Sequence, residues 1–235
     1  MPAPEASESL APVHLGLILD GNRRWARAKG LPVFEGHRRG YETLHAIALA
    51  AQQRGVKYIS AFVFSTENWE RTQEEVDFLM DLMVWIATKE INKFLEEGFK
   101  VVFLGSRERL SQKVIAAIDS AQQRTAGNTG AVLAMCFNYG GQIELAEGVA
   151  RLVTGGVPAA EVTLAVLEQY LYHPEVPPVD LLIRTSGEQR LSGFMMWRTA
   201  YAELLFSDTL WPDYSEIELD SAILEYSNRK RRFGK

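Results

Sequence analysis

The sequence predicts an α/β fold: a central, mostly parallel sheet flanked by helices on both faces. Short apolar runs typical of buried strands alternate along the chain with longer segments of helical periodicity. The apolar runs are continuous rather than alternating with polar residues, as expected of strands covered on both sides. With 235 residues and no internal repeat, the chain is expected to form one domain over residues 13–235, preceded by a disordered segment at 1–12.

The first half of the chain contains three predicted strands and two predicted helices. The run VHLGLIL is typical of a buried strand and ends at an Asp-Gly-Asn turn signal. Gly55 and Gly98 follow helical segments as C-terminal stop residues, and Thr72 with Glu75 forms a capping-box pattern at the start of the second helix. The predicted elements are a strand at 13–19, a helix at 36–54, a strand at 58–64, a helix at 72–97 and a strand at 99–104.

The second half continues the alternation. The run 131–137 is again apolar, and a Gly/Pro-containing stretch at 154–158 separates two helical segments. Ser215 with Glu218 repeats the capping-box pattern before a C-terminal helix. The predicted elements are a helix at 111–124, a strand at 131–137, a helix from about 141, a helix at 163–172, a strand at 179–183 and the helix that starts at 215.

One predicted helix is unusually apolar. Between Val76 and Ala87 all residues except Asp77 and Asp81 are apolar. A helix on an ordinary α/β sheet needs an apolar stripe of only about 100°. The segment is therefore either a central core helix or a helix covered on two sides, by the sheet and by a subunit partner or an apolar ligand. In the second case, an apolar tunnel is expected.

Composition excludes several classes of protein. The formal net charge of −5 argues against a nucleic-acid-binding protein, and the single cysteine, Cys136, excludes an intrachain disulfide and fits a reducing compartment. No signal peptide or membrane span is recognised, so a cytoplasmic protein is expected. Basic residues nevertheless cluster at 23–39 and 229–235, which predicts a compact anionic ligand.

Polar residues follow two of the early predicted elements. In an open α/β sheet, ligands bind beyond the carboxyl ends of the strands. The first strand exit reads DGNRRW over 20–25, where a carboxylate suits Mg²⁺, a glycine suits close approach of the backbone to phosphate, and arginines add positive charge. The segment GHRRG at 36–40 opens a helix with three basic side chains. A plain turn and a solvated helix start are the respective alternatives.

Two later strand exits have the same character. The segment STENW at 65–69 is polar, although a simple connecting loop would look similar. At 184–192, Arg184 and Arg190 lie six residues apart with Ser192 beyond them, a set suited to a diphosphate. A surface loop paired through Glu188 is the alternative there. Taken together, the four segments favour a phosphate-bearing ligand.

Familiar signatures of other enzyme classes are missing from the sequence. There is no GxxxxGK[ST] or GxGxxG segment and no GxSxG elbow, and the four histidines lack zinc-ligand spacing. The aspartate cluster of the all-α prenyl synthases is also missing. P-loop, dinucleotide, serine-hydrolase and zinc chemistries therefore have no support.

A set of motifs nevertheless resembles one family. The segments are HLGLILDGNRRWA, GH at 36–37, FSTENW, TAGNTG, NYGG, VDLLIRTSGEQRLS, YAELLF, LWPD and the RRFG ending. Together they resemble the cis-prenyltransferases, with the closest similarity to bacterial undecaprenyl diphosphate synthases. The resemblance spans residues 13–234.

The resemblance implies an activity and a set of partners. A Mg²⁺-dependent homodimer would elongate an allylic diphosphate, such as farnesyl diphosphate, with isopentenyl diphosphate units. The implied product is undecaprenyl diphosphate, a cell-wall lipid carrier, which allows peripheral membrane contact through the lipid; no nucleic acid is implied. The alternatives are a family member with a shorter or branched product and a non-catalytic subunit. The second is disfavoured because Asp20, both strand-exit arginines and the Arg-x-Gly ending are present.

The resemblance also assigns roles to matching residues. Asp20 is implied to be catalytic and to bind Mg²⁺, Asn68 to orient the substrate or a water, and Glu203 to be a dimer-side metal carboxylate. Asn68 cannot be the base because an amide is not basic, and either Asp20 or the departing diphosphate remains open for that role. The implied contacts of the allylic diphosphate are Gly21, Asn22, Arg23, Arg24, Trp25 and His37.

The residues expected to border the reacting carbons are Ser65, Asn68 and Trp69, with Thr66, Glu67 and Arg71 also binding substrate. Isopentenyl diphosphate is assigned to Arg184, Arg190 and Ser192, and Arg232 with Gly234 is implied to reach the partner subunit's site.

Four positions depart from the common family pattern. Arg23 stands where many bacterial members have glycine, Val33 where many have arginine, and Gly193 where asparagine is common. The first two changes offset each other in charge at the primer site. Val63, where long-chain members commonly carry alanine, is expected to point away from Phe62 and Phe64 and to narrow the tunnel.

Overall fold

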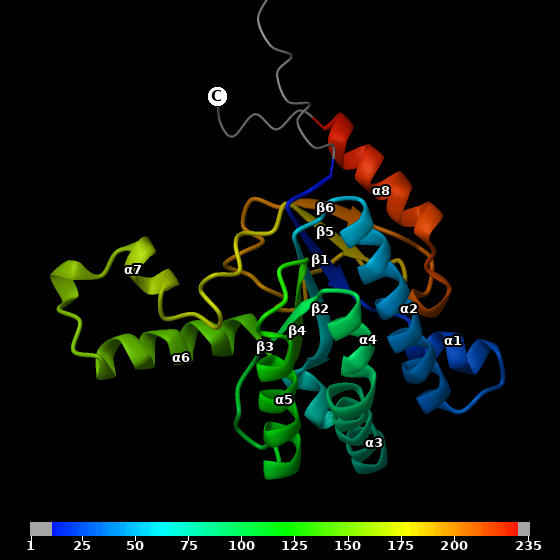
Figure 1. The fold of residues 1–235 in the computed structure, drawn as a ribbon, viewed down its shortest axis with the longest axis horizontal. Helices are drawn as coiled ribbons and strands as arrows, with labels where there is room; N and C mark the ends of the chain where they lie inside the picture. Colours follow the sequence, from blue (N-terminus) through cyan, green and yellow to red (C-terminus); the bar gives the residue numbers. More distant parts are fainter. Residues whose placement is uncertain (1–10, 230–235) are drawn as a thin grey trace, which may run out of the picture.

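A computed structural model describes residues 11–229 and contains a six-stranded sheet (Figure 1). The strands are β1 (His14–Ile18), β2 (Tyr58–Ser65), β3 (Lys100–Leu104), β4 (Val132–Tyr139), β5 (Leu181–Arg184) and β6 (Glu203–Phe206). Their order is β3-β4-β2-β1-β5-β6, and all five neighbouring pairs run parallel. The predicted α/β class with a parallel sheet is confirmed.

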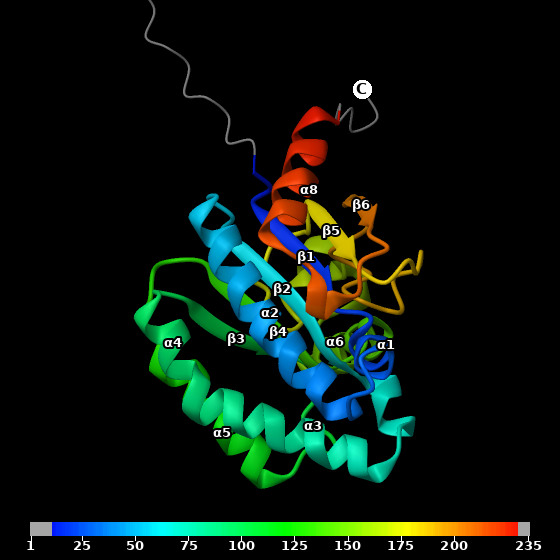
Figure 2. The ribbon, with the colours of Figure 1, turned by 90° about the vertical axis from the view of Figure 1, so that its right-hand side faces the viewer.

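Helices cover one face of the sheet in a continuous layer. They are α2 (Val33–Gln53), α3 (Gln73–Trp85), α4 (Ile91–Glu96), α5 (Gln112–Thr125) and α8 (Glu216–Asn228). Figure 2 shows α3, α4 and α5 beside α2 along this face. Their apolar residues pack on strand residues such as Leu15, Ile59 and Met135 to form the larger of two cores.

The opposite face is covered differently. A smaller core of Cys136, Tyr139, Phe194 and neighbours packs there, and Phe62 stacks on Phe194 with ring centroids 4.9 Å apart. Most of the covering residues come from the irregular segments 172–180 and 185–202 on either side of β5. The helices α6 (Gly141–Thr154) and α7 (Leu164–Glu168) extend away from the sheet on the other side of the molecule from α2 (Figure 1).

A buried ion pair holds the segment 172–202 in place. Arg198 donates to the Glu144 carboxylate at 2.7 Å, and both side chains are almost fully buried. Arg198 also donates to the carbonyl oxygens of Tyr172 and Val176, while Glu144 accepts from the backbone N–H of Tyr172. Because each charge has several partners, the network fixes both the segment before β5 and the segment after it.

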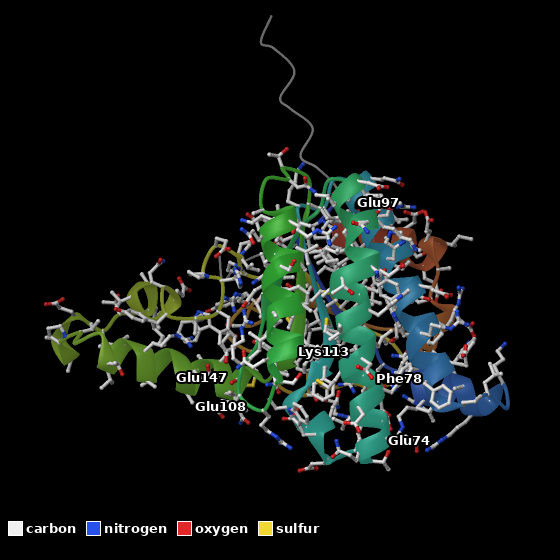
Figure 3. All side chains as sticks on the ribbon, turned by 60° about the horizontal axis from the view of Figure 1, so that its bottom comes forward. Glu74, Phe78, Glu97, Glu108, Lys113 and Glu147 are labelled. Carbon is white, nitrogen blue, oxygen red and sulfur yellow. The ribbon has the colours of Figure 1, made fainter. Side chains whose placement is uncertain are left out.

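The unusually apolar helix is not one regular α-helix. The predicted helix 72–97 is α3 followed by a π-helical turn, Ile86–Glu90, and then α4. Val76, Leu79, Met83 and Ile86 are buried against the core, and the exposed stripe of Asp77 and Asp81 ends at Trp85. Phe78 extends toward the start of α2 (Figure 3), where its ring contacts Phe34 and His37.

Some local predictions were wrong. The short helix α1 (Asn22–Ala28) and the strand β6 were not predicted, and the helix expected at 163–172 is only Leu164–Glu168. Residues 1–10 of the segment expected to be disordered lie outside the described residues, whereas Pro12 is buried and Ala11 packs on the larger core. Within residues 11–229, no helix is both long enough and apolar enough to cross a bilayer.

Candidate active site

The order of the strands changes direction beside β1, which makes this a topological switch point of the sheet. The chain crosses from β1 to β2 on one side and later returns to pair β5 on the other side of β1. In open α/β sheets, the crevice at such a reversal is where ligands bind, beyond the carboxyl ends of the strands. The residues that follow β1 and β5 meet here, as the sequence predicted.

Asp20 and Arg184 form the centre of this crevice. An Arg184 Nη2 donates to Asp20 Oδ2 at 2.7 Å, and Nη1 donates to Ser192 Oγ at 2.9 Å. The Arg184 side chain is only 4% exposed, and its Nε has no hydrogen-bond partner among the described residues. A buried guanidinium N–H without an acceptor is costly, so this edge of Arg184 is suited to an anionic ligand.

The loop after β5 has a strained backbone. Ser186 and Ser192 have φ of 78° and 49°, in the left-handed region that non-glycine residues seldom occupy. Each costs of the order of 1–3 kcal/mol unless the surroundings enforce it, and such residues cluster at ligand sites. Here Ser192 Oγ is held by Arg184, and Ser186 Oγ accepts a hydrogen bond from Arg24.

Two glycines allow α1 to approach this crevice. Gly21 precedes α1 with φ of 113°, and a Cβ there would lie 3.0 Å from the Leu210 backbone. A Cβ on Gly36 of α2 would lie 2.1 Å from the carbonyl oxygen of Asn22. Only glycine permits either arrangement. The start of α1 is therefore held against α2, with its basic residues at the carboxyl edge of the sheet.

A strongly basic cavity lies at this edge. Its lining combines Asp20, Gly21, Asn22 and Glu188 with His37 and the arginines Arg23, Arg24, Arg27, Arg71 and Arg190. Arg24 also lies 3.8 Å from Asp20 and 3.7 Å from Glu188, and Arg190 pairs with Glu188 at 2.5 Å. The surplus of arginine over carboxylate makes the cavity suited to a multiply charged anion.

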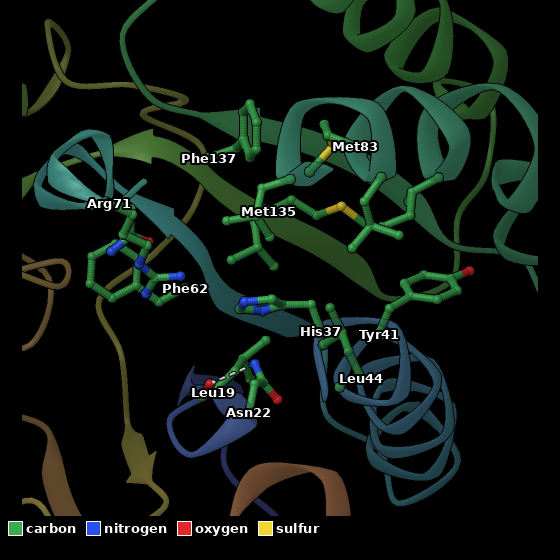
Figure 4. A pocket seen from close by; sticks show the side chains of 16 residues that line it. Leu19, Asn22, His37, Tyr41, Leu44, Phe62, Arg71, Met83, Met135 and Phe137 are labelled. Carbon is green, nitrogen blue, oxygen red and sulfur yellow. Dashed lines mark hydrogen bonds between the residues drawn. The ribbon is translucent and has the colours of Figure 1, made fainter. Parts of the chain in front are cut away.

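Two further cavities adjoin the basic one. The second is mixed in character and is lined by Asp20, Ser65, Glu67, Asn68, Arg71, Arg184 and Ser192, with Ile18, Leu19 and Phe62. The third runs between β2, α2 and α3 (Figure 4) and is lined mainly by apolar side chains, among them Tyr41, Leu44, Val63, Leu79, Leu82, Met83, Ile86, Met135 and Phe137. Leu19 and Arg71 line all three cavities. The regions suited to anions and the region suited to an apolar chain therefore meet at these two residues.

Val63 lines the apolar cavity, but the expected alternation around it is broken. The pairing of β2 with β4 slips between Phe62 and Phe64, so that Val63 is an extra residue in a β-bulge. Phe62 packs against the smaller core, whereas Val63 and Phe64 both pack against the larger one. The prediction that Phe62 and Phe64 share a face is wrong because a bulge shifts the two-residue period.

Glu75 joins several of the basic residues. Its Oε1 accepts from His37 Nε2 at 3.1 Å and from Arg71 Nη1 at 2.8 Å, and its Oε2 lies 3.7 Å from Arg23 Nε. The hydrogen bond from His37 and the nearby arginines lower the pKa of Glu75, against the effect of burial. Burial lowers the pKa of Arg71, a change that Glu75 opposes and Arg23 reinforces.

Several predicted site residues lie outside the three cavities. Trp25 donates to Asp213, and Trp69 donates to Asn138 beneath the Arg109 guanidinium. Thr66 packs beside Gly140. Glu203 pairs with Arg229 at 2.8 Å and is level with Leu181 at the amino end of β5, so this chain does not bring it to Asp20. Arg232 and Gly234 lie outside the described residues.

Other site residues were not predicted. Leu19, Arg27 and Tyr41 line the cavities, and the sequence pattern indicates only a capping role for Glu75. Leu19 looked like the end of a buried strand, and the Tyr41 position looked like ordinary core. The pairing of Glu75 with His37 joins residues 38 positions apart, which no local pattern signals.

Comparison with known proteins agrees with this geometry. A family profile described as "Putative undecaprenyl diphosphate synthase" matches residues 18–234. The chain belongs to the cis-prenyltransferase family. It is 44% identical to an isoprenyl transferase of Thermotoga maritima over 95% of this chain and 97% of that protein. It is 42% identical to a decaprenyl diphosphate synthase of Mycobacterium leprae, over 98% of this chain and 79% of that one.

The fold agrees with solved structures of cis-prenyltransferases. Lavandulyl diphosphate synthase from Lavandula x intermedia, in complex with dimethylallyl diphosphate, superposes with a TM-score of 0.90 at 31% identity. The match covers 97% of this chain and all of that one. This chain is therefore a prenyltransferase that carries out cis-prenyl chain elongation on prenyl diphosphate substrates.

Proposed function

We propose that this cis-prenyltransferase condenses isopentenyl diphosphate with an allylic primer, farnesyl diphosphate, in a Mg²⁺-dependent reaction that ends at undecaprenyl diphosphate. The observation that carries the proposal is the meeting of the three cavities at Leu19 and Arg71. The basic cavity suits the primer diphosphate, the cavity at Arg184 suits the second diphosphate, and the apolar cavity suits the growing hydrocarbon chain.

The residues present fit a magnesium ion held partly by substrate. Within residues 11–229 there is no group of three or more His, Cys, Asp or Glu side chains placed to hold a metal. Mg²⁺ is commonly bound by one or two carboxylates together with substrate phosphate oxygens, and Asp20 supplies one carboxylate between the two anion cavities. Bound there, the ion would stabilise the charge on the leaving diphosphate. The proposed second carboxylate, Glu203, would have to act from a partner subunit.

The chain's own residues can assist the bond changes directly. The C1–O bond of the allylic diphosphate breaks, and its negative charge is received by Arg23, Arg24 and Arg71 around the basic cavity. The isopentenyl double bond then attacks C1, with its own diphosphate held by Arg184 and Ser192. A proton leaves the isopentenyl C2 to form the new double bond.

Asn68 and Asp20 differ in their ability to accept the proton that leaves in the last step. The Asn68 side-chain oxygen accepts from the backbone N–H of Ser65 at 3.1 Å, so this residue is already fixed at the junction of two cavities. An amide cannot take the proton, so Asn68 orients the substrate. Asp20 Oδ2 is engaged by Arg184, and its second oxygen lies near Arg24. The departing diphosphate and Asp20 both remain open as the base.

A shorter product is the second candidate function. The apolar cavity has a volume of about 120 Å³. An engineered protein cavity of roughly 150 Å³ holds one benzene molecule. In the present conformation the cavity therefore holds about one five-carbon unit. A long chain requires Leu82, Met83 and their neighbours to move, and an enzyme in which they do not move would stop early or make a branched product.

The proposal includes a homodimer. Ile143, Val149 and Val153 on α6 and Leu164 on α7 are exposed on helices that extend from the body of the molecule. Apolar residues gathered on a projecting element favour contact with another protein surface. Sedimentation velocity of the wild type and of Val149→Asp/Val153→Asp tests this, because a dimer through α6 would dissociate in the variant. Peripheral contact with a membrane would follow from the lipid product.

Product sizing tests the proposed activity. The protein is incubated with farnesyl diphosphate, labelled isopentenyl diphosphate and Mg²⁺, and the products are separated by chain length. Undecaprenyl diphosphate is the expected main product. A product shorter than undecaprenyl diphosphate, or a ten- or fifteen-carbon product when dimethylallyl or geranyl diphosphate replaces farnesyl diphosphate as primer, supports the second candidate. No condensation with any of the three primers refutes both. Omission of Mg²⁺ with excess chelator is expected to abolish turnover.

A further inference from the structure

Glu75 does not complete the cap that its sequence position predicts. It is the third residue of α3, and its backbone N–H bonds to the side chain of Thr72, as a capping box requires. In the reciprocal bond the backbone N–H of Thr72 would donate to the Glu75 carboxylate, but that carboxylate instead accepts from His37 and Arg71. Local rules of this kind are most often broken where a residue serves a functional site.

The carboxylate connects four segments of the chain. His37 lies on α2, Arg71 immediately before α3, and Arg23 on α1, and their contacts with Glu75 span 2.8–3.7 Å. The Glu75 and His37 side chains are only 10% and 9% exposed, so water screens their contact little, whereas the Arg23 side chain is 43% exposed. Each of the three partners lines the basic cavity, whereas Glu75 lines none of the three cavities.

The charges around Glu75 do not balance without a ligand. Two arginines and a histidine surround a single carboxylate, and because Arg23 and Arg71 carry like charges they repel one another, which adds to the effect of burial in lowering the pKa of Arg71. Glu75 is ionised at neutral pH because its pKa is lowered. It therefore reduces the repulsion between the cations and leaves a net positive charge facing the cavity.

We propose that Glu75 is a positioning residue that holds Arg23, Arg71 and His37 in the arrangement that receives the diphosphate of the allylic primer. This inference rests on the proposed function and adds to it a residue that acts on the primer through these three side chains. Arg23 makes the requirement stronger in this chain, because it brings an additional cation next to Arg71. Without Glu75 the cations would separate, and binding of the diphosphate would have to bring them back together.

The test compares Glu75→Gln with two controls. The glutamine keeps the size of the side chain and removes its charge. Glu74→Gln makes the same change at the neighbouring exposed position of α3 (Figure 3), and Thr72→Ala removes the side-chain cap of the helix without altering the cluster. Glu75→Gln is expected to raise the KM for farnesyl diphosphate roughly tenfold, as loss of a charged hydrogen bond predicts. The KM for isopentenyl diphosphate and kcat are expected to change less than about threefold, and both controls should match the wild type in all three constants.

Binding of inorganic pyrophosphate, measured by calorimetry, provides a readout that does not depend on turnover. Removal of a negative charge near an anion site would by itself tighten binding, so weaker binding in Glu75→Gln supports positioning and equal or tighter binding overturns it. In an Arg23→Ala background, the effect of Glu75→Gln should fall to roughly threefold, because one of the cations to be held is gone. A wild-type protein that binds pyrophosphate but forms no prenyl product would refute the proposed function without deciding the role of Glu75.

Discussion

The carboxylate of Asp20 has a structural contact and a proposed catalytic one, and substitutions at this position can separate them. Asp20→Asn keeps an oxygen that can accept from Arg184 Nη2, now 2.7 Å from Oδ2, but removes the charge. A hydrogen bond involving a charged acceptor contributes about 1.5–3 kcal/mol and a neutral one about 0.5–1.5 kcal/mol. Because Arg184 also retains Ser192 Oγ and the Arg190 carbonyl, we expect a loss of about 1 kcal/mol in the free energy of unfolding.

The expected effect of Asp20→Asn on catalysis is much larger. Removal of one preorganised electrostatic group typically lowers kcat by about 10²–10³-fold, and loss of a metal ligand can lower it further. Asp20→Ala should be equally inactive but less stable than Asp20→Asn by about 1–3 kcal/mol, since it leaves a buried guanidinium N–H without an acceptor.

The assay measures incorporation of labelled isopentenyl diphosphate at saturating Mg²⁺ alongside urea unfolding of each variant. Asp213→Asn is the matched control, because this exposed carboxylate bonds Trp25 and lines none of the three cavities. Turnover of Asp20→Asn within about tenfold of the wild type would refute the assignment of Asp20 to the metal and diphosphate. Equal losses in Asp213→Asn would show that charge near the sheet edge, rather than this carboxylate, is required.

Three further predictions concern chain length, subunit contact and pH. Val63→Ala should lengthen the products and Val63→Leu or Val63→Phe should shorten them, because Val63 lines the apolar cavity. As a control, Val132→Ala, next to the smaller core, should leave the product lengths unchanged. An unaltered distribution of lengths across the Val63 series would mean that length is set elsewhere. Removal of residues 230–235 should lower activity. If these residues act in the partner subunit's site, mixing the truncated protein with Asp20→Asn should restore part of the activity in hybrid dimers. No recovery of activity in verified hybrids would contradict a role in the partner's site. His14 donates from Nδ1 to the Pro177 carbonyl and accepts from Ser60, and burial lowers its pKa from 6.5 to about 4, so protonation favours the unfolded chain. The free energy of unfolding should therefore fall by about 3 kcal/mol as the pH drops from 6.5 to 4. Urea titrations of His14→Asn should show a flatter dependence on pH, and an unchanged slope would assign it to other groups.

The sequence predicted the long elements well, and it missed short ones for identifiable reasons. Continuous apolar runs mark β1 to β5 because those strands are buried on both faces, whereas the four residues of β6 are only half-buried at the sheet edge. The helix α1 has only seven residues and no side-chain cap at Gly21, so neither periodicity nor capping signals it. The π-helical turn after α3 inserts an extra residue without changing the residue types that favour helix.

The same contrast applies to the candidate site. Strand exits identified Asp20, Arg184 and Ser192, because in a parallel sheet all carboxyl ends meet at one edge. The sequence could not show that Trp69 turns toward Asn138 or that Glu203 lies at the opposite end of its strand, since both depend on register and side-chain direction. The Thr72 side chain caps the Glu75 backbone as predicted, but the Glu75 carboxylate has other partners, because a local capping pattern cannot reveal competition from a residue 38 positions away.

The pairing of β1 with β5 determines when the site can exist during synthesis. Leu15 pairs with Leu181 and Ile18 with Arg184, so the second strand arrives some 166 residues after the first. A nascent chain can form the layers around β2, β3 and β4 while one edge of β1 is still open, and contacts between such distant segments form slowly. Only when Arg184 has left the ribosome can Asp20 acquire its buried partner. Binding of substrate at Arg184 is therefore expected to report that β5 has paired with β1, and truncated translation products that end before β5 should lack this binding site.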